Sequence, residues 1–96
     1  MNAREFIFMA LALLEKVLNN DISYSELQRV IDSSVIKDEL PNDISKDALK
    51  NIFDLQTDLE LIAEHQNTYA GTFSYYSKEQ ITNILSKYKG LLKNNL

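Results

Sequence analysis

Polar and apolar positions follow the same order at three places in the chain. In "DISYSEL", "DISKDAL" and "YYSKEQI" a serine follows an apolar residue, and a second apolar residue stands four places after that serine. Apolar residues then continue at spacings of three and four, as on one face of an amphipathic helix. The three serines are unequally spaced, so there is no fixed repeat period. We therefore interpret the three stretches as helix starts and not as internal repeats.

Each serine is placed to cap a helix. Its hydroxyl can accept a hydrogen bond from a backbone N–H of the first turn, which has no partner inside the helix. Glu26 follows Ser23 by three residues and Gln80 follows Ser77 by three, which predicts two capping boxes. Ser45 has Ala48 at that position, which cannot bond back. The flanking apolar residues predict three hydrophobic staples: Ile22 with Leu27, Ile44 with Leu49, and Tyr76 with Ile81.

Helical spacing extends these starts into four predicted helices, at about Ala3–Leu18, Tyr24–Ser33, Lys46–Glu64 and Lys78–Lys93. In three of them we expect these residues to be buried: Phe6, Met9, Leu13, Leu14 and Val17; Leu49, Ile52, Phe53, Leu59 and Ile62; Ile81, Ile84, Leu85, Tyr88 and Leu92. In the first helix Ile7, Phe8 and Leu11 lie off this stripe, which predicts an exposed apolar patch. The fold class we predict is all-α, a compact antiparallel four-helix bundle that forms a single domain over residues 1–96.

Composition supports this fold and says little about cellular context. The chain has 96 residues, two glycines, one proline and no cysteine, too little turn chemistry for an all-β protein and no means of forming disulfides. The apolar run from Phe6 to Leu14 is shorter than the roughly 20 residues that span a bilayer. It is also not followed by the cleavage pattern of a signal peptide. We therefore expect a cytoplasmic protein without a membrane segment.

Charge is distributed unevenly along the chain. The net charge is −4, but residues 32–64 contain nine acidic and three basic side chains, whereas residues 65–96 contain one acidic and four basic ones. An acidic protein is a poor ligand for nucleic acid, whose phosphates need a basic surface. A basic protein surface is the better partner for the acidic middle of the chain.

The predicted third helix concentrates the candidate binding residues. Asp54 and Asp58 are four residues apart on one face, and Glu60 and Glu64 are four apart on an adjacent face. Such acids also occur on ordinary solvated helix faces. The loop that follows adds Tyr69 and Tyr75 as surface candidates, because tyrosines beside charges are typical of protein interfaces. Phe73 and Tyr76 are expected to pack into the core.

Catalytic and metal-binding patterns are lacking in the sequence. His65 is the single histidine, and its position near a predicted helix end suits the negative end of the helix dipole better than a triad or a zinc site. Gly71 and Gly90 stand alone and do not form a phosphate-binding loop. We therefore predict that the protein is not an enzyme and needs no metal or cofactor.

The segments "LLEKVLNNDIS", "SELQRVI", "LKNIFDLQTDLE" and "SKEQITNILSKYKGLL" together resemble small helical bacterial immunity proteins, of the colicin D type and of contact-dependent growth inhibition systems. The resemblance lies in apolar positions and helix starts. It implies that the chain binds a cognate toxin, often a nuclease that cleaves transfer RNA, and covers its basic active site with an acidic helical surface. It places Asp58, Glu60 and Glu64 in the region that faces the toxin. Helical geometry then adds Asp54, and proximity adds Tyr69 and Tyr75.

Two other functions stay open. A small helical adaptor or regulatory subunit, as a monomer or a homodimer, would use the apolar patch of the first helix. A helix-turn-helix DNA-binding protein would use "ISYSELQRVIDSS", but this segment lacks a basic recognition helix and is therefore disfavoured.

Overall fold

The computed structural model describes residues 1–68 and 77–96, and the side chains of all of these except residues 64–68. It contains α1 (Ala3–Leu18), α2 (Tyr24–Ile36), α3 (Lys46–Thr68) and α4 (Lys78–Lys93), and no strand within the described residues. The all-α prediction is confirmed, as are all four predicted helix starts. No helix in the part of the chain that the structure describes is long and apolar enough to cross a membrane.

Two predicted helix ends are wrong, because α2 continues beyond Ser33 to Ile36 and α3 continues beyond Glu64 to Thr68. The pair of serines at the expected end of α2 does not break it. The Ser34 hydroxyl donates to the Val30 carbonyl at 3.0 Å, so this side chain is satisfied inside the helix. The chain leaves the helix at Asp38, whose φ of 54° lies in the left-handed region that commonly ends helices.

The three predicted serine caps form. Ser23, Ser45 and Ser77 accept hydrogen bonds from the third backbone N–H beyond them, at 3.3, 3.1 and 3.1 Å. At Ser77 the Gln80 side chain returns the bond to the cap N–H at 2.8 Å, which completes the predicted capping box. At Ser23 the prediction of a complete box is wrong, because the Glu26 carboxylate pairs with Arg29 at 2.9 Å. A guanidinium one turn away offers an exposed carboxylate a second charge-assisted partner, which competes with the backbone N–H of the cap.

The start of α1 has two caps that the sequence analysis did not anticipate. Asn2 and Glu5 form a complete capping box. The Asp43 carboxylate, in the loop before α3, accepts a hydrogen bond from the Ala3 N–H at 2.9 Å. A residue forty positions away therefore satisfies one of the open N–H groups of α1 and fixes the loop against it.

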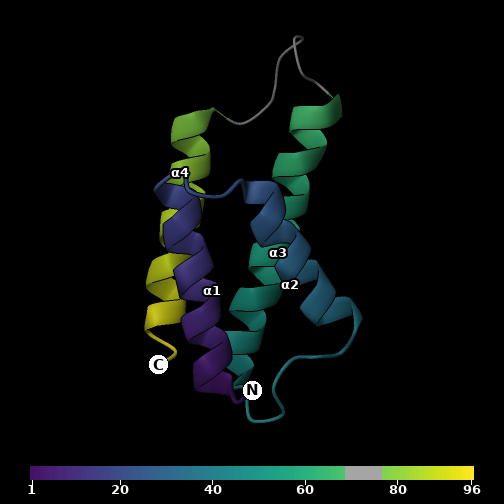
Figure 1. Cartoon of the computed structure of the whole chain (residues 1–96), viewed down its shortest axis with the longest axis vertical. Helices are drawn as coiled ribbons and strands as arrows, with labels where there is room; N and C mark the ends of the chain where they lie inside the picture. The colour runs from purple at the N-terminus through teal and green to yellow at the C-terminus, as the bar shows by residue number, and fades with distance from the viewer. Residues whose placement is uncertain (69–76) are drawn as a thin grey trace.

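The helices form a closed ring of neighbours: α1 packs beside α2 and α4, and α3 packs beside α2 and α4. Figure 1 shows that the two chain ends lie at the same end of the molecule. The ring encloses one hydrophobic core, to which every helix contributes. The buried apolar residues are Phe6, Ile7, Ala10, Leu14, Leu27, Ile31, Ala48, Ile52, Leu55, Leu59, Ile62, Leu85, Tyr88 and Leu92.

The core differs from the prediction in α1. Ile7 is only 2% exposed, so the expected patch of Ile7, Phe8 and Leu11 does not exist as predicted. Leu11 is half-buried and Phe8 alone is largely exposed. Since α1 contacts two neighbouring helices, its buried arc extends beyond one edge of the predicted stripe and includes Ile7.

A second difference lies in α3, where Phe53 was expected in the core but is 42% exposed, and Leu55 is buried in its place. Several other residues expected to be buried lie at the core margin and are half-buried: Met9, Leu13, Val17, Leu49, Ile81 and Ile84. The expected core residues Phe73 and Tyr76 lie outside the described residues.

Candidate functional site

The predicted binding residues fall into two groups. Asp54, Asp58 and Glu60 lie in the middle of α3 with described side chains. Glu64 belongs to the same helix, but its side chain lies outside the described residues, as do Tyr69 and Tyr75. The structure therefore bears on the acidic part of the predicted surface and not on its aromatic part.

Asp54 forms an ion pair within α3. Its carboxylate accepts a hydrogen bond from the Lys50 ammonium, one turn earlier, at 2.8 Å. This bond raises the pKa of Lys50, and the charge of the carboxylate adds to the effect. Both side chains are about half exposed or more, so water screens the pair. The Asp54 carboxylate therefore remains accessible to a partner.

Asp58 instead joins α3 to α4. The phenol of Tyr88 donates a hydrogen bond to the Asp58 carboxylate, and the Lys87 ammonium lies 3.7 Å from the same oxygen. Lys87 also lies over the Tyr88 ring, 4.6 Å from its centre. Burial, followed by the contact with Asp58, raises the pKa of the Tyr88 phenol well above its usual value, so the folded protein holds this proton into the alkaline range. Asp58, with 28% of its side chain exposed, therefore serves mainly as a structural contact between α3 and α4.

Glu60 is exposed and lies on the other flank of α3. Residues two apart on an α-helix point in nearly opposite directions, because each residue turns the helix by about 100°. The neighbouring turn on the Glu60 flank contacts α2, since the Gln56 amide donates to the Asp32 carboxylate at 3.1 Å. The predicted acids therefore lie on two sides of the outer face of α3. Asp54 and Asp58 lie towards α4, and Glu60 lies towards α2.

Between these two flanks, the outer face of the middle of α3 carries little positive charge. From Asn51 to Ser77 the sequence contains no lysine or arginine. Two cations lie beside this face: Lys50, which pairs with Asp54, and Lys87, which lies near Asp58. The outer surface of the middle of α3 is therefore bordered by carboxylates, two of which have lysine neighbours.

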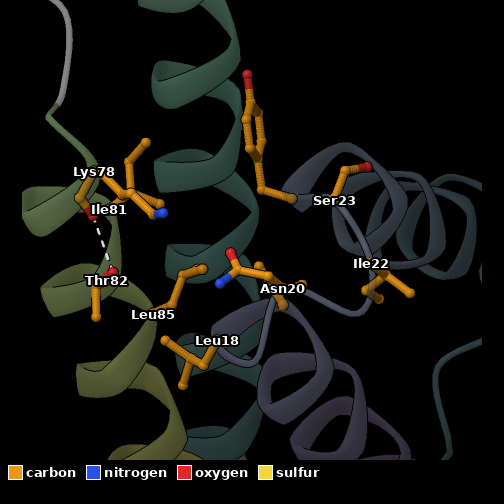
Figure 2. A pocket seen from close by; sticks show the side chains of 10 residues that line it. Leu18, Asn20, Ile22, Ser23, Lys78, Ile81, Thr82 and Leu85 are labelled. Atoms are coloured by element: carbon orange, nitrogen blue, oxygen red, sulfur yellow. Dashed lines mark hydrogen bonds between the residues drawn. The ribbon is translucent and has the colours of Figure 1, made fainter.

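A pocket of about 220 Å³ lies away from these acids, between the end of α1, the turn into α2 and the start of α4 (Figure 2). Its lining combines apolar and aromatic residues with four polar ones: Val17, Leu18, Asn20, Ile22, Ser23, Tyr24, Lys78, Ile81, Thr82 and Leu85. The Thr82 hydroxyl donates to the Lys78 carbonyl at 2.9 Å, and Ser23 is used as a helix cap. The pocket could not be predicted from the sequence, because its walls come from both halves of the chain.

No group of three or more His, Asp or Glu side chains is arranged to hold a metal ion among the residues whose side chains are described. The fold and the α3 carboxylates define the class of the protein as a small all-α protein with an acidic third helix. Comparison of the chain with protein-family models, curated proteins and solved structures finds no match. The resemblance to immunity proteins therefore stays a prediction.

Proposed function

We propose that this chain is an immunity protein, which binds a cognate bacterial toxin domain in the cytoplasm and neutralises it by covering a basic active site with the acidic surface of α3. The toxin class that fits is a nuclease, with transfer RNA as a candidate substrate. The observation that carries the proposal is the exposed middle of α3, where Asp54 and Glu60 border an outer face that contains no lysine or arginine from Asn51 onward.

The charge distribution suits such a partner. A nuclease needs basic groups to hold phosphates, so carboxylates on a rigid helix can take the place of the nucleic acid backbone. Opposite charges also speed association, which matters for an inhibitor that must capture a toxin before it acts. The proposed action is binding alone, without catalysis, metal or cofactor.

The proposal includes the finer description of the fold as a compact antiparallel four-helix bundle. The ring of helix neighbours and the position of both chain ends at one end of the molecule support it (Figure 1). Such a bundle holds α3 between two neighbours and presents its outer face as a stiff surface.

A helical adaptor or regulatory subunit, acting as a monomer or as a homodimer, is the second candidate, and Phe8 is the observation that favours it. This aromatic ring is 50% exposed on α1, with the Arg4 guanidinium 5.6 Å from its centre. With Ile7 buried, however, the apolar surface of α1 is smaller than the sequence predicts.

The test is to co-express the chain with the protein encoded immediately upstream and to purify the complex at low and high salt. We expect a one-to-one complex that weakens as salt rises, because screening reduces the attraction between the two surfaces. Glu60→Lys and Asp54→Lys should each weaken it. Asp21→Lys is the matched control, since Asp21 is exposed in the turn between α1 and α2 and the charge change is the same.

Asp58 is unsuitable for this test, because its replacement would also remove the contact with Tyr88. If no complex forms, or if the upstream protein has no toxin domain, the immunity function is wrong. The adaptor then becomes the better account. If Asp21→Lys weakens the complex as much as the α3 variants do, the partner responds to overall charge and not to the α3 surface.

A further inference from the structure

The outer face of α3 carries an exposed apolar stripe between its acidic flanks. Phe53, Thr57 and Leu61 follow one another at a spacing of four, so they lie on successive turns of the same side of the helix. Phe53 is 42% exposed and Leu61 is 37% exposed, and Thr57 between them is exposed as well. We call these three residues the α3 stripe.

Thr57 is less polar in this setting than its residue type suggests. Its hydroxyl donates to the Phe53 carbonyl at 3.1 Å, one turn earlier in the same helix. The hydroxyl therefore has a partner within the helix and needs none from outside, and the residue adds a methyl group to the surface. The α3 stripe is thus apolar from the Phe53 ring to the Leu61 side chain.

Carboxylates border the stripe on both sides, with Asp54 and Asp58 towards α4 and Glu60 towards α2. An apolar centre inside a charged rim is the usual anatomy of a protein-binding surface, in which the centre supplies most of the affinity and the rim selects the partner. A second copy of the chain is a poor occupant, because two such faces would bring like-charged rims together.

We propose that the α3 stripe is the apolar centre of the partner-binding surface, and that its occupant is a protein surface with an apolar recess bordered by lysine and arginine side chains. This inference rests on the proposed function and deepens it, because it assigns affinity to Phe53 and Leu61 and steering to the carboxylates. Charge alone would bind many basic proteins, whereas an apolar stripe of fixed spacing selects for a matching shape.

The chain offers matched controls for each stripe residue. Phe53→Ser and Leu61→Ser remove the apolar centre. Phe8→Ser and Leu91→Ser make the same changes at exposed sites on α1 and α4. Leu61 and Leu91 are equally exposed, at 37%. Titration calorimetry with the purified toxin domain of the upstream protein measures Kd. We expect each stripe variant to raise Kd at least about tenfold, and each control to change it less than about threefold.

A second pair of variants guards against a loss of folding. Thr57→Lys leaves the core untouched and places a positive charge on the stripe, where it should repel a basic partner and raise Kd at least about tenfold. Thr82→Lys is its control, because Thr82 is an exposed α4 threonine whose hydroxyl also donates to a carbonyl one turn earlier, at 2.9 Å. Circular dichroism checks that every variant is folded.

The outcomes separate the two proposals. If the complex forms and the three stripe variants bind like the wild type, the stripe proposal is overturned and the immunity function stands. If the wild-type chain forms no complex, both are overturned. If sedimentation shows a wild-type dimer that Leu61→Ser dissociates, the stripe contacts a second copy of the chain, and the proposal of a basic partner is wrong.

Discussion

Replacing Tyr88 with phenylalanine removes one oxygen atom from the contact between α3 and α4. Tyr88 is buried, and its phenol donates a hydrogen bond to the Asp58 carboxylate. The substitution keeps the ring and the packing of its apolar part. The change in the free energy of unfolding should therefore report the hydrogen bond itself and not the loss of a core side chain.

The expected size follows from the charge and the exposure of the acceptor. Hydrogen bonds to charged groups contribute roughly 1.5–3 kcal/mol to stability. Asp58 keeps 28% of its side chain exposed, and the Lys87 ammonium remains 3.7 Å away, so water and this cation can partly replace the lost donor. We therefore expect Tyr88→Phe to lower the free energy of unfolding by about 1–2 kcal/mol. In a domain of this size each kcal/mol lowers Tm by about 4–8 °C.

Urea unfolding followed by circular dichroism at 222 nm measures this difference. A double-mutant cycle with Asp58→Ala then isolates the interaction between the two side chains. The single Asp58→Ala variant should be destabilised by about 1–3 kcal/mol, because it leaves a buried hydroxyl without an acceptor. Lys50 and Asp54 form an exposed pair that serves as the control cycle, and their coupling should be much smaller.

The same contact predicts a pH dependence at the alkaline end. The pKa of the Tyr88 phenol is raised in the folded protein, first by burial and then by Asp58. The unfolded chain therefore releases this proton first, at about pH 10, while the folded protein still holds it. The stabilisation is complete below about pH 10 and falls as the pH rises above it, by up to about 1.4 kcal/mol per pH unit. The slope should be shallower in Tyr88→Phe than in the wild type.

Two results would refute this reasoning. A Tyr88→Phe variant within about 0.3 kcal/mol of the wild type would mean that the phenol bonds water as well as it bonds Asp58. Equal alkaline slopes in the two proteins would mean that Tyr88 is not the residue whose proton release weakens the fold.

The remaining predictions concern the core and a helix cap. Leu59→Ala, at a fully buried position of α3, should destabilise the fold by about 2–5 kcal/mol in urea unfolding, whereas Leu61→Ala two residues later should change it by less than about 1 kcal/mol. Ser77→Ala removes the cap of α4 and should lower stability by about 1 kcal/mol, with Ser77→Asp close to the wild type because aspartate is also a good cap. Equal effects of Leu59→Ala and Leu61→Ala, or of Ser77→Ala and Ser77→Asp, would contradict these assignments.

Local signals in the sequence were sufficient to place the helix starts, although not all of the helix ends. A serine hydroxyl needs only the next three residues to cap a helix, so Ser23, Ser45 and Ser77 identify their helix starts without knowledge of the rest of the chain. The half-formed box at Ser23 shows the limit of such signals. Glu26 has two partners within reach, the Arg29 side chain and the backbone N–H of the cap, and local spacing does not decide between them.

Contacts between helices could not be predicted in the same way. Whether Ile7 or Met9 of α1 is more deeply buried depends on which two helices border α1, and Phe53 is exposed because α3 turns Leu55 towards the core instead. The bond from Gln56 to Asp32 and the bond from Tyr88 to Asp58 also join different helices. Periodicity fixes the width of an apolar face, but its exact direction is fixed by the neighbours.

The contacts between helices also show that the predicted binding residues are not equivalent. The sequence presents Asp54, Asp58 and Glu60 as equivalent surface charges, whereas the structure gives Asp58 a buried phenol as a partner and leaves Glu60 exposed on the opposite flank. A charge reversal at Asp58 would weaken the fold and a complex together, so a loss of binding there could not be assigned to recognition. Glu60 and Thr57 are exposed, so their substitution can change binding with little change in stability. A surface used for recognition should show this separation of binding from stability, whereas a merely solvated helix face should show no effect on binding at all.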